Sequence, residues 1–227
     1  MHFEKIHNKG QAQLFKSRYL EIFTKTHPLV AWAMYFPLAL YLNYFSIAVV
    51  GISIAATLFS FVGGIFFWTF FEYVIHRFAF HFEATSGVSR KVVYLIHGNH
   101  HEYPRDKQRL FMPPLPSILL AGTIYFIQYV IAFLLGLQMF VASFFAGFIF
   151  GYLLYGSIHY AIHAWNPPFK WMKPLWRNHH LHHYKEQDLG FCVSSTLWDR
   201  VFGTMYNLKE EKENREEVSK LMYEKSN

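Results

Sequence analysis

Two long stretches of this chain contain no charged side chain. Asp, Glu, Lys and Arg are all missing from residues 28–71 and from residues 111–169. A bilayer core of about 30 Å needs roughly 20 apolar helical residues, so each stretch can cross a membrane twice. Turn-forming residues divide the first at 43–46, followed by Gly51, and the second at 136–138. The pattern predicts two transmembrane hairpins, with helices at 29–44, 47–70, 115–135 and 138–160.

Basic residues lie outside these predicted spans and indicate how the chain is oriented. Lys and Arg occur before residue 28, in the central segment 72–110 and after the fourth span, whereas both hairpin tips lack them. The positive-inside rule then places both termini and the central segment on the cytoplasmic face. Orientation and contact with anionic lipid account for the net charge of +6, so no nucleic-acid partner is expected.

The same pattern predicts an all-α integral membrane protein in three parts. Residues 1–27 form a cytosolic amino-terminal segment, 28–208 a membrane domain with a cytosolic helical cap, and 209–227 a charged tail. No cleavable signal peptide is expected, because the first apolar stretch begins late and is long. The single cysteine, Cys192, cannot form an internal disulfide, which fits a reducing cytosolic face.

Ten of the 14 histidines fall into four spaced motifs at the cytoplasmic ends of the predicted spans. The motifs HX4H, HX2HH, HX3H and HX2HH contain His76, His81, His97, His100, His101, His159, His163, His179, His182 and His183. On an α-helix, positions i, i+3 and i+4 share one face, so the HX3H pair and each HX2HH triplet can aim at one common volume. Residues five apart diverge by about 140°, which suits His76 and His81 to two different metals, or to two sides of one cavity.

Ten imidazoles are more than one ion can bind. A metal centre takes about four to six ligands, so two metals with open positions are expected. Imidazole suits Fe, Zn, Cu or Ni, and the ligands alone leave that choice open. His2, His7 and His27 have no comparable partners and are interpreted as interface residues, and His180 is expected to lie near the metals without binding them.

Several other polar residues are candidates for supporting roles. Glu72 precedes His76 by one turn and could accept its second N–H, as metal-bound histidines usually require; the alternative is a capping or interface carboxylate. Asn99 and Asn178 are expected in turns or caps, and Trp198 with Asp199 is expected to lock the carboxy-terminal segment over the site. The carboxylates that flank the triplets could orient histidines in the same way: Glu102, Asp106, Glu186 and Asp188.

The histidine motifs and the residues between them resemble one enzyme superfamily. Their order, with "HGNHHEYPRDKQRLFMPP" and "HHLHHYKEQDLGFCVSSTLWDRVFGT", is similar to the membrane di-iron oxygenases of the fatty acid hydroxylase and sterol desaturase superfamily, and within it to the fatty acid 2-hydroxylases. The resemblance runs from about Thr26 to Thr204. It implies that the ten histidines bind two Fe ions, with Zn possible in purified protein. It also implies that O2 and two electrons place one oxygen atom on carbon 2 of a fatty acyl chain, free or in a sphingolipid.

The chain departs from that family in two ways. Many eukaryotic members carry a fused cytochrome b5 domain with an HPGG motif, and nothing here resembles one. The expectation is therefore no haem in this chain and a separate electron donor, of cytochrome b5 or ferredoxin type, with a bacterial cytoplasmic membrane favoured over the endoplasmic reticulum. Eukaryotic members often have Tyr-Asp before HX3H, where this chain has Tyr155 and Gly156. Tyr155 stays a candidate beside the site, while the contact with the substrate head group is left open.

Two alternatives remain at this point. One is another reaction of the superfamily, such as sterol methyl oxidation, desaturation or carotenoid hydroxylation, against which "RLFMPP" and "HHYKEQDLGF" argue. The other is a non-catalytic metal transporter or a bis-histidine haem protein. Transport sites are expected near the middle of the membrane, whereas these spans lack ionisable residues until their cytoplasmic ends.

Overall fold

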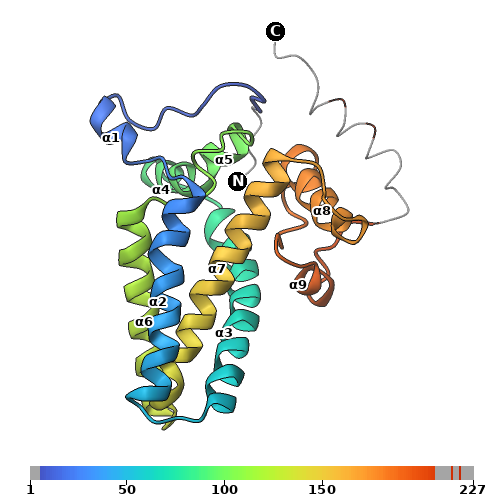
Figure 1. Cartoon of the computed structure of the whole chain (residues 1–227). Helices are drawn as coiled ribbons and strands as arrows, with labels where there is room; N and C mark the ends of the chain where they lie inside the picture. The colour runs from blue at the N-terminus through green and yellow to red at the C-terminus, as the bar shows by residue number, and fades with distance from the viewer. Residues whose placement is uncertain (1–5, 208–215, 217–219, 221–227) are drawn as a thin grey trace. The chain divides into compact units, whose positions relative to one another are not determined.

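A computed structural model describes residues 6–207 and the isolated residues 216 and 220. Within 6–207 the regular elements are helices (Figure 1). They are α1 (Arg18–Ile22), α2 (Pro28–Ala48), α3 (Ile54–Val74), the π-helix η1 (Ile75–Phe80), α4 (Gly87–Val93), the π-helix η2 (Tyr94–Gly98), α5 (Asn99–Glu102), α6 (Pro114–Leu134), the 3₁₀-helix η3 (Gln138–Phe140), α7 (Val141–Ala164), the 3₁₀-helix η4 (Lys170–Met172), α8 (Lys173–Tyr184) and α9 (Leu197–Val201). The tail expected at 209–227 lies outside the described residues, apart from 216 and 220.

The chain divides into two compact units. Among the described residues, unit 1 is drawn from 6–24, 71–110 and 158–207, and unit 2 from 25–70 and 111–157. All ten histidines of the four motifs belong to unit 1, whereas the bulk of the long apolar helices belongs to unit 2.

Unit 2 contains most of the membrane helices that the apolar pattern predicts. Four helical stretches are long and apolar enough to cross a membrane, at Pro28–Ala48, Ile54–Phe80, Pro114–Leu134 and Gln138–Ala164. Aromatic contacts join them, including Phe67 with Phe144 (ring centroids 5.6 Å apart) and Tyr125 with Phe145 (5.0 Å). The prediction of an all-α, multi-pass membrane protein is confirmed.

Glycines allow α3 and α7 to approach closely in unit 2. A Cβ added to Gly64 would lie 1.9 Å from the backbone oxygen of Phe144, and one added to Gly147 would lie 1.8 Å from that of Phe61. Only a residue without a side chain fits at either point. Small residues at such contacts are typical of helix packing in membranes, where close approach of backbones replaces the hydrophobic effect as a source of stability.

The turn between the first two spans lies later than predicted. Residues 43–46 are helical, and the break comes at 49–53, where Gly51 has a φ of +80°. Asn43 and Ser46 donate side-chain hydrogen bonds to the carbonyls of Ala39 and Leu42, so the donors of both side chains bond within their own helix. The second break is confirmed, because α6 ends before Gly136, whose φ is +72°.

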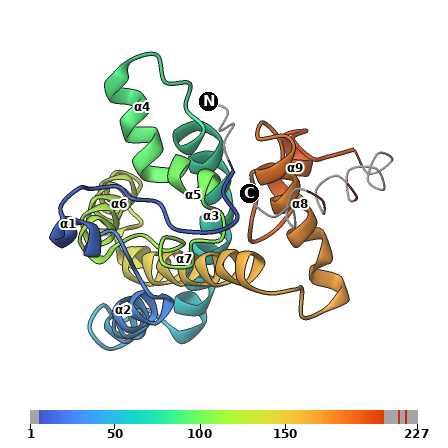
Figure 2. The ribbon, with the colours of Figure 1, turned by 90° about the horizontal axis from the view of Figure 1, so that it is seen from above.

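Unit 1 gathers short helices from segments far apart in the sequence. Its core includes a cluster of Leu181, Tyr184 and Tyr206, and a second cluster of Tyr73, Phe191 and Cys192. Both views show α9 beside α8 (Figures 1 and 2). The segments that carry the HX2HH motifs, from η2 to α5 and in α8, therefore share one compact unit with the ends of α3 and α7.

Candidate metal centre

The structure sorts the ten histidines into two groups of five. The first histidine group consists of His76, His81, His97, His101 and His182, and the second of His100, His159, His163, His179 and His183. Within each group the potential ligand atoms all lie within 4.8 Å of one another, and every member is buried. The structure thus brings together all ten histidines that the motifs single out.

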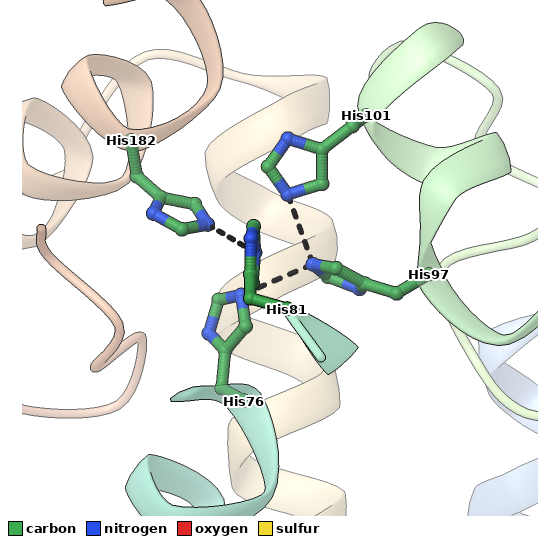
Figure 3. Close-up of side chains that lie close together, drawn as sticks. All are labelled: His76, His81, His97, His101 and His182. Atoms are coloured by element: carbon green, nitrogen blue, oxygen red, sulfur yellow. Dashed lines mark hydrogen bonds between the residues drawn. The ribbon is translucent and has the colours of Figure 1, made fainter. Parts of the chain in front are cut away.

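The first histidine group draws on three separate segments of unit 1. His76 and His81 come from η1 and its end, His97 and His101 from η2 and α5, and His182 from α8, and the rings point toward a common centre (Figure 3). Nε2 of His97 lies 3.1 Å from Nε2 of His76 and 2.9 Å from Nε2 of His101. Nε2 of His182 lies 3.0 Å from Nε2 of His81.

The expectation that His76 and His81 diverge is wrong, because it assumes an α-helix. Residues Ile75–Phe80 form a π-helix, and the backbone N–H of His81 donates to the carbonyl of His76 at 3.2 Å. In that geometry hydrogen bonds join residues five apart, so i and i+5 come onto the same face. The two rings, with centroids 5.2 Å apart, consequently serve the same group.

Each HX2HH triplet divides between the two groups, contrary to the expectation of one common volume. The residues at i and i+4 stay together, with His97 and His101 in the first group and His179 and His183 in the second. The middle residue goes to the other group, so His100 joins the second and His182 the first. The two triplets exchange one histidine each, and this exchange links the groups into one centre.

The second histidine group relies on regular α-helical spacing. His159 and His163 lie one turn apart near the end of α7, as the HX3H motif predicts. Nε2 of His163 lies 2.8 Å from Nε2 of His179, and Nε2 of His159 lies 2.9 Å from Nε2 of His100. Nε2 of His183 lies 3.1 Å from that of His179.

Backbone carbonyls fix the protonation of two rings in the first group. Nδ1 of His76 lies 2.5 Å from the carbonyl oxygen of Phe191, and Nδ1 of His182 lies 2.8 Å from that of Leu189. A carbonyl only accepts hydrogen bonds, so Nδ1 must carry the proton and donate it. In a neutral imidazole this leaves the lone pair on Nε2, the atom that faces the other histidines.

Burial keeps the imidazoles outside the spans neutral. It lowers the pKa of His97, His101 and His182 in the first group well below the usual range, and neighbouring histidines lower it further. The pKa of each of His100, His179 and His183 in the second group is lowered for the same two reasons. Ligation requires neutral histidine, so these rings are in the form that a metal binds.

The donor set fits two transition-metal ions. Nitrogens at right angles on an ion, with metal–nitrogen bonds of about 2.1 Å, are about 3.0 Å apart, and the Nε2 separations of neighbouring rings are 2.8–3.1 Å. His97 has two such neighbours, and a single N–H cannot satisfy both contacts. Buried lone pairs that converge in this way indicate metal binding. Cys192 is not expected to contribute, because burial raises the pKa of its thiol.

Glu72 does not accept the second N–H of His76, contrary to the sequence-based hypothesis. Its Oε1 accepts hydrogen bonds from the backbone N–H groups of Val193 (2.6 Å) and Ser194 (2.8 Å). Its Oε2 accepts from the Ser194 hydroxyl at 2.5 Å. The carboxylate therefore holds backbone from a distant part of the chain, and the carbonyl of Phe191 takes the place at His76 that the sequence assigned to Glu72.

Asp199 has a matching role, and Asn178 supports it. Asp199 is fully buried and accepts hydrogen bonds from the backbone of Phe191 and Cys192, both at 3.0 Å. Asn178 lies inside α8, so its expected place in a turn or cap is wrong; its side chain donates to Asp199 at 3.1 Å. Sequence reasoning anticipates that Asp199 locks this segment, but not that Asn178 completes the contact.

The remaining candidates have other partners or lie elsewhere. Asn99 donates to the carbonyls of Tyr94 and Leu95, in keeping with a capping role. Glu102 accepts from the Tyr94 hydroxyl at 2.6 Å, and Asp106 forms an ion pair with Arg109. Supporting roles for Glu186 and Asp188 stay predictions.

Histidines outside the four motifs stay outside both groups. His27 caps α2 by accepting a hydrogen bond from the backbone N–H of Leu29. His180 belongs to neither histidine group, and burial lowers its pKa to about 4. His2 lies outside the described residues. Tyr155 belongs to unit 2, where its ring packs against Trp68 with centroids 5.7 Å apart.

The amino-terminal segment connects the two triplets. The backbone N–H of His7 donates to the carbonyl of Glu102 at 2.7 Å, just after the first triplet. The hydroxyl of Tyr184, just after the second triplet, donates to the side chain of Asn8 at 2.7 Å. Ile6 packs against the cluster that contains Leu181 and Tyr184. No sequence signal pointed to this link, because residues 6–8 lie outside any motif.

Comparison with known proteins gives consistent results. A family model described as fatty acid hydroxylase matches residues 61–204. The chain is 38% identical over 209 residues to the ceramide very long chain fatty acid hydroxylase of Saccharomyces cerevisiae, covering 90% of this chain and 52% of that protein. It is 35% identical to a dihydroceramide fatty acyl 2-hydroxylase of Arabidopsis thaliana, over 90% of this chain and 84% of that protein. The chain thus spans about half the length of the yeast relative.

A solved structure is also similar. Full-length scs7p, in which only the hydroxylase domain is visible, matches with a TM-score of 0.80 and 35% sequence identity. The match covers 88% of this chain and 74% of that one. The similarity extends well beyond the histidine motifs, to most of the described chain.

Proposed function

This chain belongs to the fatty acid hydroxylase family, and we propose that it hydroxylates carbon 2 of a fatty acyl chain. One C–H bond and O2, with two electrons and two protons, give one C–OH bond and water. The observation that carries the proposal is the pair of buried all-imidazole groups, in a chain that is 35% identical over nine-tenths of its length to a fatty acyl 2-hydroxylase.

The proposed cofactors are two Fe ions, one in each histidine group. Bound iron would supply the redox chemistry that O2 activation requires, and Zn could occupy the same ligands in purified protein. The chain contributes the rest. Burial keeps the imidazoles neutral and excludes water, and the carbonyls of Leu189 and Phe191 set the direction of two rings.

The substrate is proposed to be a membrane lipid. The names of the yeast and plant relatives point to ceramide and dihydroceramide acyl chains, so an acyl chain in a sphingolipid is favoured over a free fatty acid. Such a chain can reach the protein from the bilayer that the four apolar helices would occupy. A supporting role for Tyr155 stays a prediction.

The basic residues flanking the spans support an active site on the cytoplasmic face. Electrons are proposed to come from a separate carrier of cytochrome b5 or ferredoxin type, and a bacterial cytoplasmic membrane is favoured. The membrane face, the electron carrier and the type of membrane are three independent proposals, and none of them changes the reaction proposed for the site.

Lipid mass spectrometry tests the proposal. The chain is expressed with a reductase and a carrier of each type, and membrane lipids are compared with those from cells expressing a chain with His100→Ala and His101→Ala. New 2-hydroxy acyl lipids are expected only with the unaltered chain. A changed sterol or carotenoid profile without 2-hydroxy lipids would instead assign another reaction of the superfamily. Purified protein that contains haem and no other metal would exclude an oxygenase of this type.

A further inference from the structure

Two buried carboxylates lie behind one loop that contacts the first histidine group. We propose that Asp199 and Glu72 are positioning residues for that group, acting through residues 189–194, here called the carboxylate-held loop. The inference rests on the proposed function, because it concerns the binding of one of the two metals. Neither carboxylate is hydrogen-bonded to a motif histidine in the contacts described above, and both hold the backbone of this loop.

Four consecutive backbone N–H groups of the loop point at these two carboxylates. Asp199 accepts from Phe191 and Cys192, both at 3.0 Å, and Glu72 accepts from Val193 at 2.6 Å and Ser194 at 2.8 Å. Hydrogen bonds to a carboxylate are shorter and stronger than those between neutral groups. Both carboxylates are almost completely buried, with 0% and 5% of their surface exposed, so water does not compete for these bonds.

Further contacts hold the carboxylates themselves in place. Asp199 also accepts from the hydroxyl of Thr204 at 2.8 Å and from the side chain of Asn178 at 3.1 Å. Glu72 also accepts from the hydroxyl of Ser194 at 2.5 Å. Because Asn178 lies in α8 one residue before His179, Asp199 ties the loop directly to the helix that carries the second triplet.

With its amides fixed in this way, the loop presents two carbonyls to the first histidine group. The carbonyl of Phe191 accepts from His76, and that of Leu189 accepts from His182. The hydroxyl of Tyr206 also lies 2.9 Å from the Leu189 oxygen. A ring whose Nδ1–H is held loses little freedom when Nε2 binds a metal, so a fixed loop favours binding.

The second histidine group has a different support. His159 and His163 lie one turn apart on α7, and His179 and His183 lie one turn apart on α8, outside the carboxylate-held loop. The loop contacts His76 and His182 through hydrogen bonds and His81 through the ring of Phe191, and all three belong to the first group. Loosening the loop should therefore weaken one metal site and spare the other.

The test is metal binding by purified full-length chains with Asp199→Asn or Glu72→Gln. Fe²⁺, added without oxygen, and Zn²⁺ are titrated against a chelator, and bound metal per chain is counted. The unaltered chain is expected to bind two ions. In each variant, one ion should bind about 10- to 100-fold more weakly, and the other should keep its affinity.

Asp106→Asn is the matched control. Asp106 is a similarly buried carboxylate of unit 1, with 4% of its surface exposed, and Arg109 keeps its second partner Glu21 when Asp106 is altered. This variant should bind both ions as the unaltered chain does. Ser194→Ala removes only the hydroxyl contact with Glu72, so it provides a milder variant if Asp199→Asn fails to fold, and it should weaken the same single ion by a smaller factor.

The outcomes separate the inference from the proposed function. Two ions bound by the unaltered chain, with selective loss of one in the loop variants, support the inference. Equal weakening of both ions, or of neither, overturns the inference and leaves the proposed function standing. An unaltered chain that binds neither metal overturns both.

Discussion

The two histidine groups use the same donor atom but reach it by different helical geometry. In the second group, α7 and α8 each supply a pair of histidines at i and i+4 on a regular α-helix. The first group takes its opening pair from a π-helical turn and its carbonyl supports from a loop held by two carboxylates. Local helix geometry therefore accounts for much of the second group, whereas the first depends on tertiary contacts.

This difference indicates where each group is vulnerable. A regular helix is stabilised by its own backbone, so the second group should survive changes elsewhere in unit 1. A π-helical turn is rare in isolation and is associated with functional sites, and four backbone N–H groups of the loop at 189–194 donate to Glu72 and Asp199. The first group should thus be the one that distant substitutions disturb.

The largest effect is expected from removing one proposed ligand of each group. His182→Ala and His159→Ala should each lower formation of 2-hydroxy lipid more than about 100-fold and leave membrane insertion intact, because His182 lies outside the apolar stretches and His159 lies only at the end of one. Each variant should also lose one metal, from the first and the second group respectively. Lipid analysis and metal counting measure both effects, and undiminished product from both variants would refute the ligand assignment.

Low pH should lower the stability of the folded chain through the histidines of both groups, so it would not distinguish one group from the other. The histidines with lowered pKa values stay neutral in the folded chain, whereas in the unfolded chain they take up protons below a pH of about 6.5. The unfolded state then binds more protons, so the free energy of unfolding should fall as the pH is lowered from about 6.5, by up to about 1.4 kcal/mol per pH unit for each such histidine.

Thermal unfolding in detergent between pH 8 and pH 5 measures this fall. His180 should contribute down to a pH of about 4, where its folded form also takes up a proton. A melting temperature that does not change over this range would contradict the neutral, buried state of both groups.

A smaller and selective effect is expected from Gly190→Ala. Gly190 has a φ of +70°, and an added Cβ would lie 2.4 Å from Cε2 of Tyr206. The substitution strains the carboxylate-held loop at a cost of about 1–3 kcal/mol, so the metal of the first group should bind more weakly than that of the second. Gly203→Ala, also at positive φ but with open space around it, serves as the control. Equal metal affinities in the two glycine variants would argue against a role for the loop.

The sequence predicted the components of the site better than their assembly. Charge-free stretches predicted four apolar helices, and the spaced motifs singled out all ten histidines that the structure brings together. Both inferences rest on local sequence, the first on the length of uncharged stretches and the second on the spacing of histidines along a helix. The position of the first turn was predicted too early. Asn43 and Ser46 hydrogen-bond to carbonyls of their own helix, which their polarity alone does not predict.

The errors at the site have a common physical origin. The spacing of His76 and His81 was interpreted on an α-helix, and backbone hydrogen bonds that join residues five apart rather than four reverse the conclusion. Glu72 was paired with its sequence neighbour His76, whereas its partner Ser194 lies more than a hundred residues away. The helix type at His76 and the hydrogen-bond partners of Glu72 depend on tertiary contacts, so they cannot be predicted from a short segment of sequence.

The link made by residues 6–8 has a practical consequence for the design of shortened chains. A chain trimmed to begin at the first apolar helix would keep every motif histidine and every apolar helix. It would lose the contacts of His7 and Asn8 that join the ends of the two triplets. A trimming boundary chosen from motif or hydropathy plots alone would therefore remove part of the scaffold that keeps α5 and α8 together.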